Sequence, residues 1–123
     1  MNKSQKKRIL LAEDDDSMRR FVEIILKKAG YEVLAAEDGL AAMQVALETE
    51  IDALVSDAIM PNLSGYDLCR MIRGNDEEKK IPCIILSGRV SESDDETRKI
   101  ADTFLVKDTN LKENLTSALE NLL

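Results

Sequence analysis

Five polar residues of this chain each stand directly after a short apolar run. They are Glu13, Asp14, Asp57, Ser87 and Lys107. The runs before them have the composition of buried strands, and the carboxyl ends of parallel strands open on one edge of a sheet, where ligands bind. We therefore expect the five side chains to meet in one pocket. Three carboxylates, one hydroxyl and one ammonium together are suited to a divalent cation and a phosphoryl group.

The three carboxylates need a counter-charge if they lie together. Two carboxylates about 4–5 Å apart repel each other by about 4 kcal/mol at an effective dielectric constant near 20. Mg²⁺ fits such a site, because it prefers oxygen ligands and keeps waters that an incoming phosphoryl group can replace. With Mg²⁺ and Lys107, the net charge of the pocket falls to about zero. The alternative is a solvated acidic loop that caps a helix, which accounts well for Asp15 and Asp16.

Four motifs in fixed order carry a family resemblance. They are Leu11-Ala12-Glu13-Asp14-Asp15-Asp16, Val55-Ser56-Asp57-Ala58-Ile59-Met60-Pro61, Leu86-Ser87-Gly88 and Val106-Lys107. In this order and spacing they resemble the receiver domain of bacterial two-component response regulators, of the chemotaxis-regulator-like kind. The resemblance covers nearly the whole chain, from about Lys7 to Leu122. It implies a single receiver domain over 1–123, with a basic tail at 1–7.

The resemblance implies a role for each acidic residue. Asp57 would be the phosphoacceptor, and a sensor histidine kinase or a phosphotransfer protein would donate the phosphoryl group. Asp14 and Asp57 would bind Mg²⁺ directly and Glu13 through water. The backbone carbonyl of Ile59 would supply a further oxygen ligand. The protein would then be a signalling module and not an enzyme with a separate substrate, since it would catalyse only its own phosphorylation and dephosphorylation.

The resemblance also implies a conformational switch. Lys107 would neutralise one phosphoryl oxygen, and Ser87 would donate its hydroxyl to another. The inward shift of Ser87 would leave space into which Phe104 can turn; a core position for Phe104 is equally natural and compatible with this. The face formed by the fourth helix, the fifth strand and the fifth helix would then bind an effector protein or an attached output domain.

Two positions near the site suggest slow loss of the phosphoryl group. Ile59 stands two residues after Asp57, and Arg89 stands two residues after Ser87. In the family these positions flank the route of the attacking water; isoleucine cannot orient a water, and arginine could cover a phosphoryl oxygen. The alternative is that both side chains point to solvent.

One position departs from the family pattern. The residue after the site lysine is usually a proline joined by a cis peptide bond, and here it is Asp108. A cis bond costs about 0.5–1 kcal/mol before proline and about 2.5–4 kcal/mol elsewhere. We therefore predict a trans Lys107-Asp108 bond, a rerouted loop, and a lysine amine that still reaches the pocket.

The chain alternates strand-like and helix-like segments five times. The expected strands end at Ala12, Ala36, Asp57, Ser87 and Val106. Asp16, Asp38, Ser64 (with Asp67) and Asn110 (with Glu113) are the expected N-caps, and Gly30 is the expected stop of the first helix. The segment from Ser91 to Lys99 has almost no apolar residue, so its helix can bury little. Met18, Phe21, Val22, Ile25 and Ala29 recur at helical spacing in the first helix.

Continuously apolar strands are buried on both faces, which requires a parallel sheet covered by helices. The fold class is therefore α/β: a doubly wound, flavodoxin-like, three-layer fold with a five-stranded parallel sheet and five helices. The strand order 2-1-3-4-5 is implied by the resemblance.

Composition and charge exclude several classes of function. The net charge is −7, and 13 basic and 24 acidic residues remain once Lys3, Lys6, Lys7 and Arg8 are set aside. An acidic body repels nucleic acid, so we expect no direct contact with it. The absence of histidine excludes a phosphohistidine donor. No apolar run approaches the roughly 20 residues that span a bilayer, and no secretory signal is present, so we expect a cytoplasmic domain without membrane contact. Cys69 and Cys83 read as buried reduced thiols.

Two other functions remain open at this point. One is a receiver that docks on its partner without phosphorylation. The other is a haloacid-dehalogenase-type phosphatase, whose Asp-x-Asp motif Asp14-Asp15-Asp16 mimics; the absence of a cap insertion or a second acidic motif after Lys107 counts against it. Both a stand-alone regulator and the receiver portion of a longer protein fit the sequence.

Overall fold

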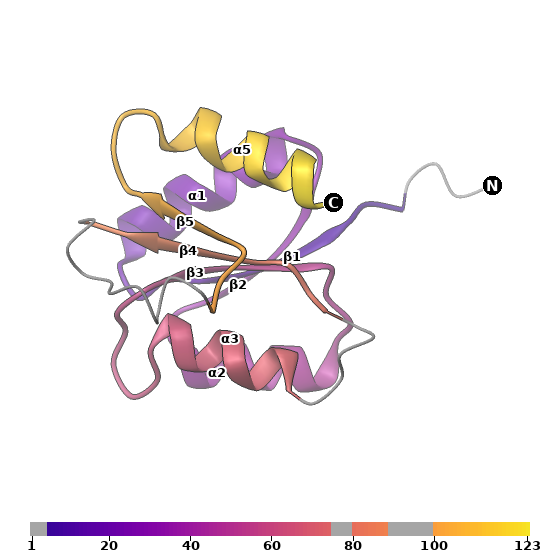
Figure 1. Cartoon of the computed structure of the whole chain (residues 1–123), viewed down its shortest axis with the longest axis vertical. Helices are drawn as coiled ribbons and strands as arrows, with labels where there is room; N and C mark the ends of the chain where they lie inside the picture. Colours follow the sequence, from indigo (N-terminus) through magenta and orange to yellow (C-terminus); the bar gives the residue numbers. More distant parts are fainter. Residues whose placement is uncertain (1–4, 75–79, 89–99) are drawn as a thin grey trace.

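A five-stranded parallel sheet forms the centre of the molecule (Figure 1). The structure is a computed structural model that describes residues 5–74, 80–88 and 100–123. Neighbouring strands all pair in parallel, in the predicted order β2-β1-β3-β4-β5. The strands are β1 (Arg8–Ala12), β2 (Glu32–Ala36), β3 (Ala53–Asp57), β4 (Cys83–Ser87) and β5 (Thr103–Val106).

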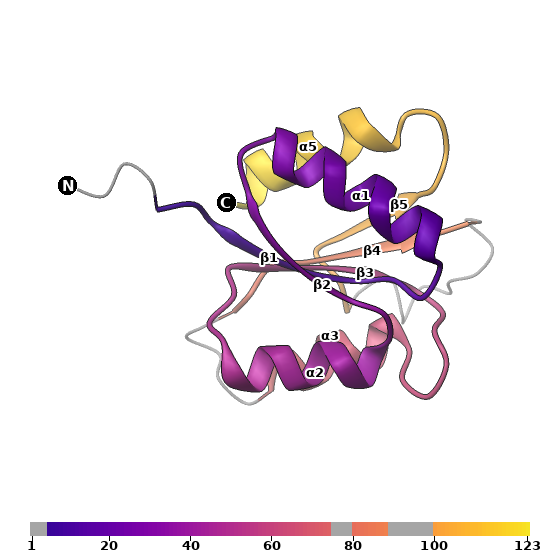
Figure 2. The ribbon, with the colours of Figure 1, turned by 180° about the vertical axis from the view of Figure 1, so that it is seen from behind.

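Helices cover both faces of the sheet. In Figures 1 and 2, α1 (Asp16–Lys28) and α5 (Leu111–Leu122) lie on one face, and α2 (Gly39–Glu48) and α3 (Gly65–Arg73) lie on the other. The described ranges thus contain four of the five predicted helices, and the helix predicted within 91–99 falls outside them. Within these same ranges, no helix combines the length and the apolar character needed to cross a membrane.

The apolar core is divided by the sheet into two main clusters. β3 and β4 are buried along their whole length, and β1 is buried after its first residue. Alternate strand residues face opposite layers, so that Ile9 and Leu11 pack toward α1 and α5, whereas Leu10 packs toward α2 and α3. The edge strands β2 and β5 are only partly buried. This pattern explains why the central strands are continuously apolar in the sequence.

The predicted N-caps of α2 and α3 are confirmed. The carboxylate of Asp38 accepts a hydrogen bond from the backbone N–H of Ala41 at 2.8 Å. The hydroxyl of Ser64 accepts one from the N–H of Asp67 at 3.1 Å. In both helices the side chain thereby satisfies one of the backbone donors that the first turn leaves without a partner.

The cap of α1 lies one residue before the predicted one. Asp15, not Asp16, has the extended backbone of an N-cap, and its carboxylate accepts from the N–H of Met18 at 2.7 Å. Asp16 is the first helical residue and forms an ion pair with Arg19. The prediction was wrong because adjacent aspartates are equivalent as sequence signals. Gly30 does follow the helix end, with a φ of 101° that suits glycine best.

The start of α5 also differs from the prediction. Asn110 is the N-cap residue, but its side chain makes no capping hydrogen bond. The carboxylate of Asp108 instead accepts from the N–H of Asn110 at 2.9 Å, and its backbone carbonyl accepts from the N–H of Leu111 at 3.1 Å. The peptide bond between Lys107 and Asp108 is trans, as predicted. Asp108 therefore organises the turn that leads from β5 into α5.

Candidate functional site

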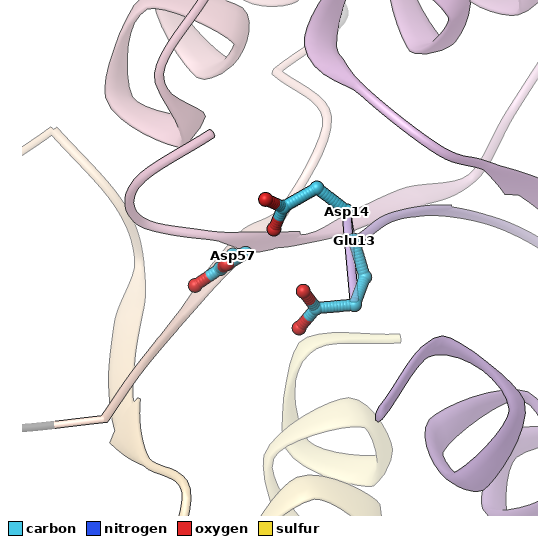
Figure 3. Close-up of side chains that lie close together, drawn as sticks. All are labelled: Glu13, Asp14 and Asp57. Atoms are coloured by element: carbon cyan, nitrogen blue, oxygen red, sulfur yellow. The ribbon is translucent and has the colours of Figure 1, made fainter. Parts of the chain in front are cut away.

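The acidic residues predicted from the sequence do meet at the carboxyl edge of the sheet. Glu13 and Asp14 follow β1, and Asp57 is the last residue of the neighbouring β3. Carboxylate oxygens of the three residues lie within 4.8 Å of one another. Figure 3 shows the three side chains projecting from the ends of these two strands. The parallel register of β1 and β3 thus brings together residues more than 40 positions apart.

Lys107 connects two of the three carboxylates. Its Nζ lies 2.7 Å from Oε1 of Glu13 and 3.0 Å from Oδ1 of Asp57. The side chains of Lys107, Glu13 and Asp57 are only 14%, 1% and 12% exposed. This confirms that the lysine amine reaches the pocket. Interactions between charges this far from solvent are screened much less than those of surface ion pairs.

Glu13 is held rigidly by its surroundings. Its second carboxylate oxygen accepts from the N–H of Asp15 at 3.1 Å. Its own N–H donates to the carbonyl of Ala36 in β2, and its carbonyl accepts from the guanidinium of Arg19 in α1. The end of β2 and the first turn of α1 therefore hold the backbone of Glu13, and the N-cap residue of α1 holds its carboxylate. A group so constrained can orient a ligand without a large loss of side-chain freedom.

The electrostatics of the pocket are dominated by burial. Desolvation raises the pKa of Glu13 above its ordinary value, and the hydrogen bond from Lys107 offsets this only in part. The pKa of Asp57 is raised for the same reasons. Burial by itself would lower the pKa of Lys107, but its hydrogen bonds to Glu13 and Asp57 outweigh that influence and raise the pKa. The pocket thus holds more negative charge than one ammonium can compensate.

Close packing of α3 supports the backbone of Asp57. A Cβ on Gly65 would lie only 2.0 Å from the carbonyl oxygen of Asp57, so no larger residue fits there. The N–H of Gly65 donates to the carbonyl of Ala58 at 2.9 Å, and the hydroxyl of Ser56 donates to the carbonyl of Asp57 at 2.9 Å. The sequence analysis missed this contact. A glycine in the first turn of a helix, directly after a good N-cap, is the signal that could have revealed it.

The other predicted site residues lie in different surroundings. Ser87 is fully buried at the end of β4, and its carbonyl accepts from the N–H of Lys107 at 2.7 Å. Phe104 is partly buried and packs against a small cluster on the α2–α3 side of β4. Ile59 is 60% exposed. The roles of the Ile59 carbonyl and side chain stay predictions, and Arg89 lies outside the described residues.

The sequence matches the response regulator receiver domain family over residues 9–120. The chain belongs to this family. It is 37% identical over 114 residues to the probable transcriptional regulator ycf27 of Galdieria sulphuraria, covering 91% of this chain and 44% of that protein. It is 32% identical over 115 residues to protein PilG of Pseudomonas aeruginosa, covering 92% of this chain and 84% of that protein. The chain therefore spans less than half of one of these relatives and most of the other.

Solved structures show the same architecture. The response regulator TrrA of Thermotoga maritima, in complex with Mg(2+)-BeF, superposes with a TM-score of 0.86 at 28% sequence identity, covering 95% of this chain and 99% of that one. The fold, the family and the acidic cluster therefore agree: this is a receiver domain of the two-component signalling type.

Proposed function

We propose that this receiver domain accepts a phosphoryl group on Asp57, with Mg²⁺, from a sensor histidine kinase or a phosphotransfer protein. One observation carries the proposal. Lys107 bridges Glu13 and Asp57 at 2.7 and 3.0 Å, within a cluster of three carboxylates that one lysine cannot neutralise. Such a pocket is suited to bind a cation first and the anionic phosphoryl group next.

The donor set fits Mg²⁺. Glu13, Asp14 and Asp57 offer carboxylate oxygens, which are hard ligands, within 4.8 Å of one another. In the proposed site Asp14, Asp57 and the backbone carbonyl of Ile59 would hold the ion, with Glu13 contributing through water. When bound, Mg²⁺ neutralises the carboxylates and offsets the charge of the phosphoryl oxygens.

Asp57 is the proposed nucleophile. One of its carboxylate oxygens forms a bond to phosphorus while the bond between phosphorus and the donor's imidazole nitrogen breaks, and that nitrogen takes up a proton. The ammonium of Lys107, already 3.0 Å from Asp57, is placed to neutralise one phosphoryl oxygen. The hydroxyl of Ser87, at the end of the adjacent strand β4, is the proposed donor to another.

The proposed consequence of phosphorylation is a change of the partner-binding face. As Ser87 shifts toward the phosphoryl group, Phe104 in β5 turns inward. The proposed face consists of the predicted fourth helix, β5 and α5, of which the first lies outside the described residues. It would bind an effector protein or an attached output domain. We also propose a cytoplasmic location.

Incubation with Mg²⁺ and acetyl phosphate, followed by intact mass measurement, tests the proposal. We expect a gain of one phosphoryl group, absent when EDTA is present and absent in Asp57→Asn. An unmodified wild-type chain under these conditions would contradict the proposal and favour docking without phosphorylation. Steady release of phosphate from added phosphate esters, without a protein adduct, would instead indicate a phosphatase.

A further inference from the structure

The hydroxyl of Tyr66 has no hydrogen-bond partner, although it is shielded from solvent. It is the one buried side-chain nitrogen or oxygen of the described ranges for which this is true. The whole residue is 8% exposed. Tyrosine hydroxyls usually have a partner when buried, and an unpaired buried polar group in a native structure is both rare and destabilising. The position of this hydroxyl therefore requires an explanation.

Tyr66 shares a cluster with the residue after the proposed phosphoacceptor, and the proposed switch residue packs against this cluster. Tyr66 forms the cluster with Ala58, which follows Asp57, and with Ile85 of β4. Phe104 packs against the same cluster from β5. An inward turn of Phe104 would therefore alter the packing of the cluster that contains Tyr66.

Tyr66 cannot easily leave this position. The preceding residue, Gly65, is held by its hydrogen bond to the carbonyl of Ala58, and it touches the backbone of Asp57 so closely that a Cβ would not fit. The first turn of α3 is thus fixed to the loop that follows Asp57. A hydroxyl that is held in place gains a partner only if its neighbours rearrange.

We propose that Tyr66 is a second switch residue, whose hydroxyl lacks a partner in this conformation and gains one, a water or a backbone carbonyl, when Phe104 turns inward. This inference rests on the proposed function. The unpaired hydroxyl disfavours the present conformation and leaves the alternative conformation unaffected. It therefore biases the domain toward the conformation that a phosphoryl group on Asp57 selects. Tyr66 acts through the switch and does not contact the phosphoryl group.

The two tyrosines of the chain allow a matched experiment. Tyr31 is partly buried, lies after α1 and packs in the separate cluster between the sheet and α1 and α5. The wild-type chain, Tyr66→Phe and Tyr31→Phe are titrated with beryllofluoride in the presence of Mg²⁺, and binding is measured by calorimetry. Thermal unfolding of each protein is recorded without beryllofluoride. Because the chain has no tryptophan, Tyr31→Phe also leaves Tyr66 as the single residue that dominates the near-ultraviolet absorption.

We expect Tyr66→Phe to bind beryllofluoride about three- to tenfold more weakly than the wild type, the range that one hydrogen bond gives. Its unfolding midpoint should be equal to or above that of the wild type, because no bond is lost in this conformation. Tyr31→Phe should bind as the wild type does, and its absorption should shift to longer wavelength on binding as the Tyr66 hydroxyl donates a hydrogen bond.

The outcomes separate this inference from the proposed function. Equal affinities of Tyr66→Phe and the wild type would overturn the role of Tyr66 and leave phosphorylation of Asp57 standing. A lowered unfolding midpoint of Tyr66→Phe would also overturn it, since the hydroxyl would then already have a partner. If the wild-type chain itself fails to bind beryllofluoride, the proposed function fails, and the role of Tyr66 fails with it.

Discussion

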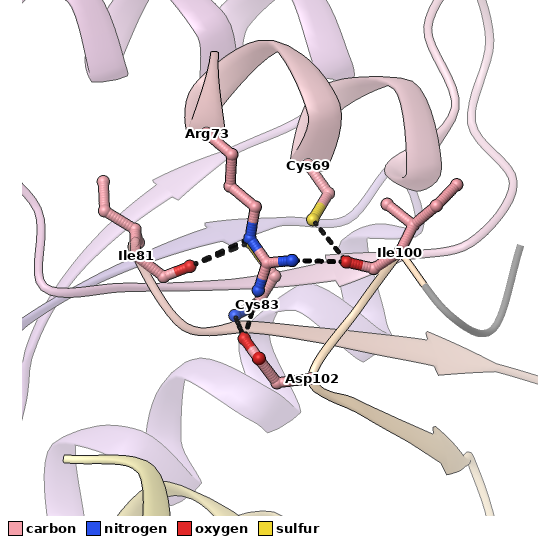
Figure 4. A network of polar contacts seen from close by, with 6 residues as sticks. All are labelled: Cys69, Arg73, Ile81, Cys83, Ile100 and Asp102. Carbon is pink, nitrogen blue, oxygen red and sulfur yellow. Dashed lines mark hydrogen bonds and ion pairs between the residues drawn. The ribbon is translucent and has the colours of Figure 1, made fainter. Parts of the chain in front are cut away.

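The amino ends and the carboxyl ends of the strands each hold a cluster of partly or wholly buried charges, but the two clusters differ in net charge. At the amino ends of β4 and β5, Arg73 of α3 meets Asp102 (Figure 4). At the carboxyl edge, one ammonium meets the three carboxylates of the candidate site. The side chains that form ion pairs at both edges are less than a quarter exposed. Burial alone therefore does not distinguish them.

Arg73 and its partners form a cluster, the Arg73 cluster, in which the charges and the hydrogen bonds of the guanidinium are satisfied. The guanidinium donates to the carbonyls of Ile81 and Ile100 and pairs with the carboxylate of Asp102. That carboxylate also accepts from the N–H of Cys83 at 2.8 Å. One positive charge meets one negative charge, and the guanidinium has an acceptor on each of its three nitrogens. This arrangement ties the end of α3 to the segments that lead into β4 and β5.

The charges of the candidate site, in contrast, do not balance. Counted over the described residues alone, its net charge is about −2 when the carboxylates are ionised, and burial raises the pKa of both Glu13 and Asp57. Breaking a satisfied buried ion pair costs stability because it leaves an uncompensated charge, whereas a buried cluster with surplus charge already carries such a cost until a ligand offsets it. This difference in charge balance supports the proposal that the carboxyl edge binds a cation.

The largest contrast is expected between Asp57→Asn and Asp102→Asn. Asp57→Asn should abolish phosphorylation and raise the stability of the metal-free protein by about 1 kcal/mol, since it removes a crowded charge and little volume. Asp102→Asn should keep phosphorylation and lower stability, because Arg73 loses its counter-charge. Intact mass and chemical denaturation measure the two effects. Stoichiometric phosphorylation of Asp57→Asn would refute the site assignment.

Replacement of the two cations should separate catalysis from stability. Lys107→Met should slow phosphorylation by acetyl phosphate about 10²–10³-fold, the usual effect of removing one group that stabilises developing charge. Arg73→Met, at a temperature where it is folded, should change this rate little. Time courses of the phosphorylated fraction give both rates. A comparable loss of rate in the two variants would remove the distinction between the clusters.

Arg73→Met should instead affect the free energy of unfolding. We expect a loss of about 2–3 kcal/mol, below the 3–5 kcal/mol of a fully buried pair because Arg73 and Asp102 are partly exposed. Urea denaturation measures it. Arg70→Met is a matched control, since its ion pair with Asp67 is more than half exposed on both side chains and should be worth less than 1 kcal/mol. Equal effects of the two variants would contradict the prediction.

The stability of the metal-free protein should depend on pH in an unusual direction. The pKa values of Glu13 and Asp57 are raised above their ordinary values of 4.5 and 3.8, so the folded state binds protons more readily than the unfolded state. Their stabilising contribution is full below the ordinary values and is lost as pH rises through the raised ones. In EDTA, the contribution of the site should therefore increase as pH falls from 7 toward 4.5.

The variant Glu13→Gln/Asp57→Asn is the control for this pH dependence. Subtracting its unfolding free energies from those of the wild type isolates the two carboxylates from the rest of the protein. The unfolding free energy of the wild type, relative to that of the variant, should increase as pH falls. Excess Mg²⁺ should reverse this trend, because the cation favours the ionised carboxylates. A difference that is flat between pH 7 and 4.5 would contradict the inferred direction of the shifts.

The smallest expected effect concerns loss of the phosphoryl group. Ile59→Asn should accelerate dephosphorylation several-fold, since an amide can orient an attacking water and an isoleucine cannot. Leu40→Asn is the matched control, because Leu40 is 58% exposed and Ile59 is 60% exposed, and Leu40 lies in α2. Decay of the phosphorylated species by mass spectrometry gives the rates. An unchanged or slower decay in Ile59→Asn would contradict the predicted slow cycling. Arg89→Glu tests the other half of that prediction.

Much of the site was predictable because it depends on where strands end. The apolar runs before Glu13, Asp57 and Lys107 predicted three parallel strands, and the carboxyl ends of such strands share one edge. The trans bond before Asp108 followed from the local cost of a cis bond. Features of the site that depend only on residue type and on strand direction can thus be predicted from the sequence.

Other features were decided only by the tertiary structure. Neighbouring residues compete for one role, so that Asp15 caps α1 in place of Asp16, and Phe21 stays half exposed while the adjacent Val22 is buried. The near contact of Gly65 with Asp57 and the unpaired hydroxyl of Tyr66 arise where α3 meets the sheet. Periodicity predicts which segments are buried, but distances of a few ångströms between segments depend on how whole layers pack. For this reason the sequence determined the fold class and the residue types of the candidate site, whereas packing determined the distances between these residues and how far each is buried.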